Sequence, residues 1–255
     1  MRIFLYATLE GDPREVLFAG DHPLESVAFD LGDRAHGFYW TEGFRGLGWG
    51  EDCVPTLKGG SAVGVPSPPA VLLPDTGSRA AATEAGPFQL ITPNIVDAER
   101  LQGLPPNWTA ASDTIDGQPF RPRRRWMLVG NAVNVRTAAW IGDRLARPGK
   151  WDGDVGQKLE PIGPWPAAAW GNGSGRWSVD VGPNPVDAPW EPLAEFLSCP
   201  GTPLSIRATR GFLSRLRTGH LRPRPAFGAL LEKHLAAMER CEQLELSALP
   251  TRKVA

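Results

Sequence analysis

Two stretches of the chain decide its fold: residues 97–105, DAERLQGLP, and residues 128–135, LVGNAVNV. Before the first stretch, Thr92 or Asn94 can cap a short helix, and Gly103 supplies the left-handed residue that ends it. The second stretch is an apolar run that reaches a Gly-Asn pair and then continues with helical spacing. The sequence therefore predicts a capped helix, followed later by a strand that turns into a second helix.

The Gly-Asn corner of the second stretch is a candidate ligand site. Residues 126–129 are expected to form the strand, and Gly130 and Asn131 the turn. Such a turn brings backbone N–H groups and a short amide side chain to one place, beside a helix start that favours polar or anionic groups. A lone Gly-Asn pair is nevertheless more typical of an ordinary structural corner. After it, apolar positions from Val135 to Leu145 predict a helix.

Composition excludes several classes of protein. The chain has 255 residues, 42% of them hydrophobic, and a net charge of -1, which argues against a generally basic nucleic-acid coat protein. Its three cysteines are too few and too scattered for a disulfide framework or a zinc site, which fits a reducing cytoplasm. No run approaches the roughly 20 apolar residues that span a bilayer, and the first residues do not form a signal sequence. We therefore expect a folded cytoplasmic protein with no metal and no membrane partner.

Outside the two stretches, three further patterns predict structure. Residues 3–7 form a continuous apolar run typical of a strand covered on both faces. Its neighbours would come from another chain or an upstream segment, or else from a pairing with residues 15–18. Near the end of the chain, a basic helix is expected from about Ser205 and an amphipathic helix over residues 227–241. The arginines of the basic helix are interpreted as a solvated face or a subunit contact.

Taken together and in this order, the two stretches resemble the last two signature blocks of DNA cytosine-5 methyltransferases, which transfer a methyl group from S-adenosylmethionine to cytosine. Arg100 and Gln102 match the penultimate block, whose helix organises the DNA-recognition domain of that family, and Pro105 and Trp108 follow at the usual distance. The resemblance implies an α/β fold: the C-terminal portion of a Rossmann-like S-adenosylmethionine-dependent methyltransferase, with a small irregular β-rich target-recognition domain and a helical C-terminal extension.

The same resemblance implies four parts of the chain. Residues 1–20 would form edge strands of the catalytic domain, and residues 21–90, rich in Gly and Pro, the target-recognition domain. Residues 91–148 would supply the helix and the strand–helix that return to the catalytic domain and the cofactor pocket. Residues 149–255 would form the C-terminal extension.

A cofactor site is also implied by the resemblance. In that family the Gly-Asn turn and the helix after it help to form the S-adenosylmethionine pocket. In this chain that role falls on Gly130, Asn131, Ala132 and Val133.

Candidate DNA contacts fall into two groups. A Gly-rich loop in the target-recognition region offers flexible backbone, hydroxyl donors and one cation, which suits phosphates or groove edges, and an arginine before it is suited to read guanine. A dense arginine run before the second stretch would clamp phosphates. The candidates are Arg45, Thr56, Lys58, Gly59, Gly60, Ser61, Arg123, Arg124 and Arg125. For each loop residue a solvated surface loop is the plainer interpretation, and for the arginine run the two interpretations weigh equally.

The groups that would perform methyl transfer are missing from the sequence. The reaction needs a thiolate to attack carbon 6 of an extruded cytosine and an acid near N3. The family supplies them from a Pro-Cys-Gln block and a Glu-Asn-Val block, and neither occurs here. Cys53, Cys199 and Cys241 stand in other contexts and are interpreted as structural. We therefore assign no catalytic residue.

The sequence thus predicts the C-terminal half or subunit of a DNA (cytosine-5-)-methyltransferase of a restriction–modification system, which carries target recognition and part of the S-adenosylmethionine site. Its expected partners are double-stranded DNA and a separate or upstream catalytic half, without which it should be inactive. Two alternatives stay open: a catalytically inactive remnant that acts as a DNA-binding or interaction module, and a truncated gene whose true start lies upstream.

Overall fold

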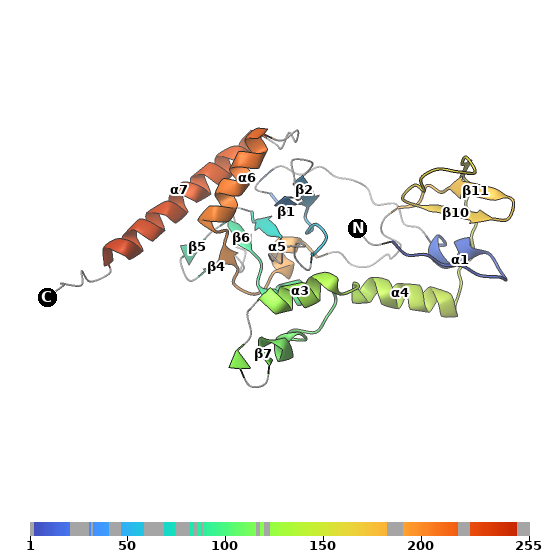
Figure 1. The fold of residues 1–255 in the computed structure, drawn as a ribbon, viewed down its shortest axis with the longest axis horizontal. Helices are drawn as coiled ribbons and strands as arrows, with labels where there is room; N and C mark the ends of the chain where they lie inside the picture. Colours follow the sequence, from blue (N-terminus) through green and yellow to red (C-terminus); the bar gives the residue numbers. More distant parts are fainter. Residues whose placement is uncertain are drawn as a thin grey trace. The chain divides into compact units, whose positions relative to one another are not determined.

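The computed structural model describes residues 3–20, 31, 33–40, 47–58, 69–74, 82–83, 86–87, 89–115, 118–119, 123–182, 191–218 and 225–248. The chain divides into two compact units, each made from two separate stretches of sequence (Figure 1). The hairpin unit comprises Met1–Val27 and Val133–Trp190, and the sheet unit comprises Ala28–Ala132 and Glu191–Ala255. This division differs from the four consecutive parts expected from the sequence, because residues 149–255 contribute to both units.

The sheet unit is built on a five-stranded sheet in the order β12-β6-β3-β1-β2, with every neighbouring pair antiparallel. Its strands are β1 (His36–Trp40), β2 (Leu47–Glu51), β3 (Ala70–Leu72), β6 (Leu90–Thr92) and β12 (Thr202–Pro203). The edge strand β12 pairs with β6 through Thr202 opposite Thr92. A late segment of the chain therefore completes a sheet whose other strands lie before residue 93.

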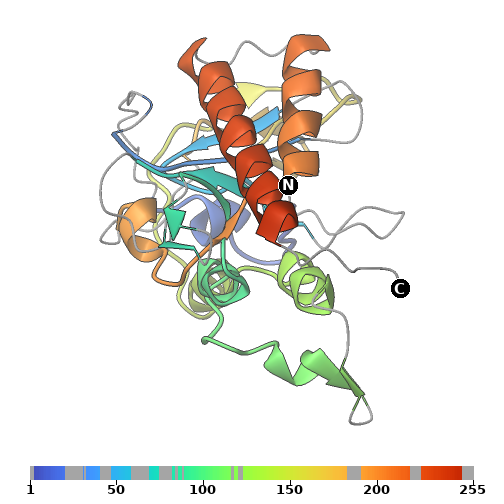
Figure 2. The same cartoon turned by 90° about the vertical axis from the view of Figure 1, so that its left-hand side faces the viewer.

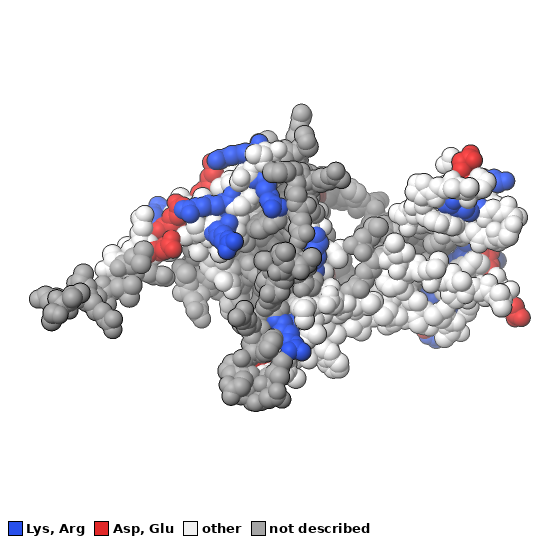
Figure 3. All heavy atoms as spheres, viewed as in Figure 1, with Lys and Arg blue, Asp and Glu red and all other residues white. Residues whose placement is uncertain are grey.

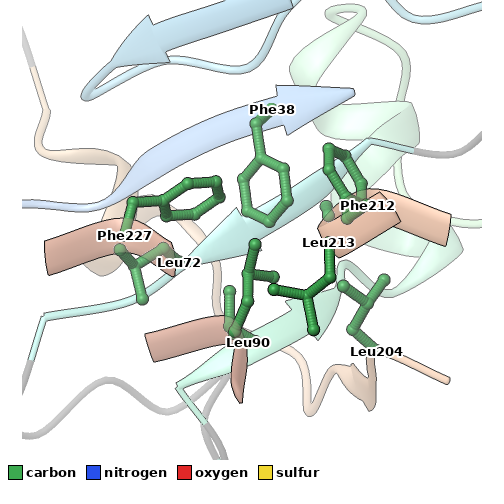
Figure 4. Packing of buried hydrophobic residues seen from close by; sticks show 9 residues of the cluster. Phe38, Leu72, Leu90, Leu204, Phe212, Leu213 and Phe227 are labelled. Atoms are coloured by element: carbon green, nitrogen blue, oxygen red, sulfur yellow. The ribbon is translucent and has the colours of Figure 1, made fainter. Parts of the chain in front are cut away.

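Two C-terminal helices cover one face of this sheet: α6 (Ile206–Thr218) and α7 (Pro225–Ala248) (Figure 2). Phe38 of β1 lies between the two helices, with its ring centroid 4.7 Å from that of Phe212 and 5.0 Å from that of Phe227 (Figure 4). Both contacts are edge-to-face, the arrangement that aromatic quadrupoles favour. The rest of the buried cluster is Ala70, Leu72, Leu90, Leu204, Leu213 and Leu231.

The opposite face of the sheet packs on α5 (Leu193–Phe196). Val71 and Ile91 each stand next to a residue whose side chain points to the first face, so their own side chains point to the opposite face. There they pack with Leu193 and Leu197 in one buried cluster. Both faces of the sheet are therefore buried by residues that follow position 190. This explains why the apolar residues of β3 and β6 are consecutive rather than strictly alternating.

Several helices lie where the sequence predicts them. α2 (Ile95–Leu101) is capped by Asn94, whose Oδ1 accepts a hydrogen bond from the N–H of Val96 at 2.9 Å, and Gly103 after it has φ 76°. α4 (Val135–Ala146) begins after the cap residue Asn134. The late helices α6 and α7 are also confirmed. Local signals were sufficient in these cases because caps and apolar spacing act within a few residues.

Two predicted strands are wrong. Residues 126–129 lie inside the helix α3 (Arg123–Asn131), because arginines and long unbranched side chains favour a helix and because helical spacing brings Trp126 and Val129 onto one buried face. Residues 3–7 form no strand, and Ile3 and Leu5 are 83% and 91% exposed. Among the residues that the structure describes, no parallel sheet of the expected Rossmann-like type is present.

The hairpin unit combines two helices with a three-stranded sheet. α1 (Pro13–Leu17) begins at the cap Asp12 and packs against α4, so the alternative pairing of residues 15–18 with residues 3–7 does not form. The sheet has the order β10-β11-β9, with β9 (Gln157–Lys158), β10 (Ala169–Asn172) and β11 (Gly175–Ser178). Trp170 and Trp177 stack across β10 and β11 with centroids 4.5 Å apart. Both rings are half-buried, and their stacking holds β10 and β11 together.

The remaining short elements belong to the sheet unit: β4 (Ala82–Thr83) with β5 (Gly86–Pro87), the 3-10 helix η2 (Ala110–Asp113), and β7 (Thr114–Ile115) with β8 (Gln118–Pro119). Within the described parts of the chain, no helix has the length and apolar character needed to cross a membrane.

Candidate functional site

The helix α2, which carries the first stretch, holds a buried carboxylate at the centre of the candidate site. Glu99 is completely buried, and its two oxygens accept hydrogen bonds from the N–H of Asn107 at 2.6 Å and the N–H of Thr109 at 2.8 Å. The hydroxyl of Thr109 donates to the same carboxylate. Asn107 adopts φ 64°, the left-handed region, so the loop after α2 is bent to bring these donors onto Glu99.

Arg125 of α3 completes this arrangement. Its Nη2 lies 2.9 Å from Oε1 of Glu99, its Nε donates to the hydroxyl of Thr109 at 3.0 Å, and its side chain is only 11% exposed. Burial alone would raise the pKa of Glu99, but the hydrogen bonds from Thr109 and Arg125 and the charge of Arg125 together lower that pKa. Glu99 is therefore held as a carboxylate, paired with a cation from the next helix.

A second hydrogen bond ties α2 directly to the second stretch. The side-chain amide of Gln102 donates to the carbonyl oxygen of Val129 at 2.9 Å, and this contact is buried. Val129 is fully buried beside Ala98 and Leu57. The last turn of α3 is thus fixed against α2 by one polar and one apolar contact.

The structure places the predicted cofactor residues at the end of that turn. Gly130 and Asn131 are the last two residues of α3, and the N–H of Ala132 donates to the carbonyl of Leu128 at 3.0 Å. The corner therefore joins two helices rather than a strand and a helix. Asn131 and Val133 are exposed, whereas Gly130 and Ala132 are half-buried.

The opposite side of α2 contacts residues 196–199, which precede β12. Asp97 is fully buried and accepts from the N–H of Cys199 at 3.0 Å, and Arg100 donates to the carbonyl of Phe196 at 2.7 Å. The guanidinium of Arg100 also lies over the ring of Phe196, 4.3 Å from its centroid. A single short helix therefore anchors α3 on one side and the segment before β12 on the other.

Sequence reasoning missed the roles of Glu99 and Asp97. A signal for Glu99 was available, since Glu99 lies one turn after the apolar Ile95 on the same helix face, and a charge that becomes buried there needs a partner. No local signal identified the partner of Asp97, because the N–H groups it binds lie in a distant part of the sequence.

The residues predicted to contact DNA differ in their burial and in their neighbours. Thr56 is exposed, and Lys58 is half-buried with its ammonium nitrogen 4.0 Å from the ring centroid of Tyr39. Arg124 is half-buried. Arg125 is paired with Glu99, so it is not part of the proposed DNA interface. Arg45, Gly59, Gly60, Ser61 and the side chain of Arg123 lie outside the described residues.

The arginines of α6 include two that form ion pairs within the chain. Arg210 pairs with Glu239 of α7 at 2.6 Å, and Arg217 pairs with Glu232 at 3.0 Å. Figure 3 shows the resulting mixture of positive and negative side chains over these two helices. All four side chains are well exposed, so each pair contributes little to stability. This surface therefore mixes both signs of charge, and two of the four arginines of α6 are paired with glutamates of α7.

Neither a reactive thiol nor a metal centre is evident in this part of the molecule. Partial burial of the sulfur and the nearby Asp52 and Glu51 raise the pKa of Cys53, which disfavours the thiolate. Among the described residues, no group of three or more His, Cys, Asp or Glu side chains is arranged to hold a metal ion.

Comparison with known proteins gives one informative relative. Over 224 residues the chain is 41% identical to the Type II methyltransferase M2.BsuMI of Bacillus subtilis (strain 168). The match covers 84% of this chain and 53% of the relative, so the chain spans about half the length of the curated protein it matches. No family model matches the sequence, and no solved structure matches it.

Proposed function

We propose that this chain is the part of a DNA cytosine-5 methyltransferase that recognises the DNA target and completes the S-adenosylmethionine site. The observation that carries the proposal is the match to a Type II methyltransferase, which covers 84% of this chain. The two stretches that resemble the last signature blocks of that family add the cytosine-5 assignment. Their helices, α2 and α3, are joined by buried polar contacts, which hold the two stretches side by side.

The corner after α3 is suited to hold part of the cofactor. Gly130 carries no side chain, and Asn131 is an exposed residue whose amide is of a kind that both donates and accepts hydrogen bonds, which suits the polar groups of a nucleoside. Ala132 and Val133 complete the proposed contact. S-adenosylmethionine would supply the methyl group. The role of α2 is to hold this corner in place through Gln102.

Target recognition is assigned to the sheet unit. Thr56 and Lys58 lie in a segment next to the β1–β2 hairpin, and a lysine there can contact phosphates while loops nearby read base edges. Double-stranded DNA is the proposed partner, and a restriction–modification system in the cytoplasm is the proposed setting.

The hairpin unit offers support for a second partner, a segment that carries the catalytic blocks. α4 packs on α1 and its residues Trp140 and Ile141 are half-buried, whereas the apolar side chains of Val135 and Leu145 are 41% and 49% exposed. A contiguous apolar patch that stays exposed is typical of an interaction site. We propose that the segment with the Pro-Cys-Gln and Glu-Asn-Val blocks covers it.

Reconstitution tests the proposed function. The purified chain alone should transfer no methyl group from tritiated S-adenosylmethionine to unmethylated duplex DNA, because the nucleophile is absent from its sequence. Addition of a polypeptide that carries the two catalytic blocks should restore incorporation of tritium at cytosine carbon 5. If the two polypeptides form a complex and bind DNA but never methylate it, the chain is instead a recognition module without an enzymatic role.

A matched pair of variants on α4 tests the proposed partner surface. Leu145→Ser should weaken the complex at least tenfold, since a buried leucine contributes about 1.5–3 kcal/mol. Arg136→Ser, on the exposed polar side of the same helix, should leave the affinity unchanged. Equal affinities for both variants, measured by calorimetry, would place the catalytic segment elsewhere.

A further inference from the structure

One end of the β1–β2 hairpin carries a stacked arrangement of three residues. Tyr39 of β1 is paired in register with Gly48 of β2. A Cβ atom added to Gly48 would lie only 2.1 Å from Cε1 of Tyr39 and 2.7 Å from its Cζ, so the ring lies across the backbone of β2 where no side chain fits. On this ring rests Lys58, with its Nζ 4.0 Å from the centroid.

The position of this stack separates it from the hydrophobic core. Phe38, the preceding residue, points into the cluster under α6 and α7, and successive side chains of a strand point to opposite faces. Tyr39 therefore lies on the other face of the sheet, which is the side of Lys58. The stack contributes nothing to the α6–α7 core, so packing of that core does not explain it.

The ring restrains the ammonium group without neutralising it. A cation above an aromatic face is attracted by the ring quadrupole, and the contact uses only one side of the ammonium. Lysine carries three N–H donors, so those directed away from the ring remain available to an anion. Within the described parts of the chain, Lys58 forms no ion pair with a carboxylate. The arrangement thus presents a positive charge in a fixed place.

We propose that Tyr39 is a positioning residue that holds Lys58 for contact with one phosphate of duplex DNA. The inference rests on the proposed function, since it specifies how one of the DNA-contacting residues works. A free lysine loses much side-chain freedom when it binds, and this loss weakens the contact. With Tyr39 beneath it, Lys58 is ordered before DNA arrives. Gly48 has the supporting role of leaving room for the ring.

Binding of a fluorescently labelled mixed-sequence duplex to the full chain, measured over a range of salt concentrations, tests this proposal. Lys58→Met should reduce the slope of log K against log salt by about 0.9, because one phosphate contact is lost. Tyr39→Leu should weaken binding about two- to fivefold with little change of slope, because the contact persists but is no longer held. Tyr39→Phe keeps the ring and should bind like the wild type.

Three further measurements make the outcome decisive. Lys158→Met, a matched charge removal on β9 of the hairpin unit, should leave the slope unchanged. In the Lys58→Met background, Tyr39→Leu should cause no further loss of affinity, and circular dichroism should show that each variant is folded. If Tyr39→Leu weakens binding equally with and without Lys58, or if Lys58→Met does not change the slope, the inference is wrong while the proposed function stands. If the wild-type chain binds no duplex at all, the proposed function itself fails.

Discussion

Replacement of Glu99 by Ala is expected to destabilise the sheet unit by about 3–5 kcal/mol, because it removes the buried carboxylate closest to the guanidinium of Arg125 and leaves that cation only the partly exposed carboxylate of Asp113, 3.4 Å away. The substitution also leaves the N–H groups of Asn107 and Thr109 without the acceptor that now receives both. An unsatisfied buried donor adds a cost of its own. Urea unfolding followed by tryptophan fluorescence would measure the loss.

The control for this variant is Glu195→Ala, since Glu195 is an exposed glutamate of the short helix α5 in the same unit. Its removal should change the free energy of unfolding by no more than about 0.5 kcal/mol. The double variant Glu99→Leu with Arg125→Leu removes both charges and should be more stable than Glu99→Ala. Similar stabilities of Glu99→Ala and Glu195→Ala would show that the buried ion pair does not hold the two stretches together.

The same carboxylate makes the stability of the sheet unit dependent on acid pH. The pKa of Glu99 is lower in the folded chain than its ordinary value, so its contribution is fully present above that ordinary value and is lost as the pH falls through the folded-state pKa. The difference in unfolding free energy between the wild type and Glu99→Gln should therefore be constant at neutral pH and should shrink only under acid conditions. A difference that stays constant down to the pH of acid unfolding would contradict this assignment.

The sequence was informative wherever the determinants of structure are local. The cap at Asn94, the left-handed Gly103 and the spacing of apolar residues along α7 each act over one or two turns, and all three predictions are confirmed. The strand predicted over residues 126–129 failed for a different reason. A short apolar run by itself fits a strand or a buried helix equally well, and the preceding arginines together with the packing of Val129 against α2 favour the helix.

The candidate site shows the same division. The two stretches predict a functional role for α2 and the end of α3, but no local pattern shows which residues are paired between the two helices. Glu99 meets Arg125 and Asp97 meets Cys199 only in the folded chain, because these contacts cross long stretches of intervening sequence. The C-terminal residues were expected to be an appended extension for the same reason. Nothing in their local pattern shows that they complete a sheet begun near residue 36.

A chain that ends at Trp190 should not fold into a stable sheet unit. The truncation removes β12, α5, α6 and α7, and with them Phe212, Phe227 and Leu197, which bury the two faces of the sheet. It also removes the N–H of Leu193, which donates to the buried Asp52 at 2.8 Å. Loss of a single buried phenylalanine costs about 3–5 kcal/mol, and typical domains are stable by only about 5–15 kcal/mol. The truncated chain should therefore show no cooperative thermal transition for this unit.

Two point variants on α7 test whether the buried side chains of this helix, rather than its presence alone, stabilise the sheet unit. Phe227→Ala should lower the free energy of unfolding by about 3–5 kcal/mol, since Phe227 is fully buried against Phe38 and Trp49. Leu244→Ala, on the same helix but 68% exposed, should have almost no effect. If the truncated chain instead kept a wild-type melting temperature by calorimetry, the C-terminal residues would be an independent addition. In that case DNA recognition would depend on the earlier strands alone. If the sheet instead needs α6 and α7 for its stability, those helices are part of the structure that presents Lys58.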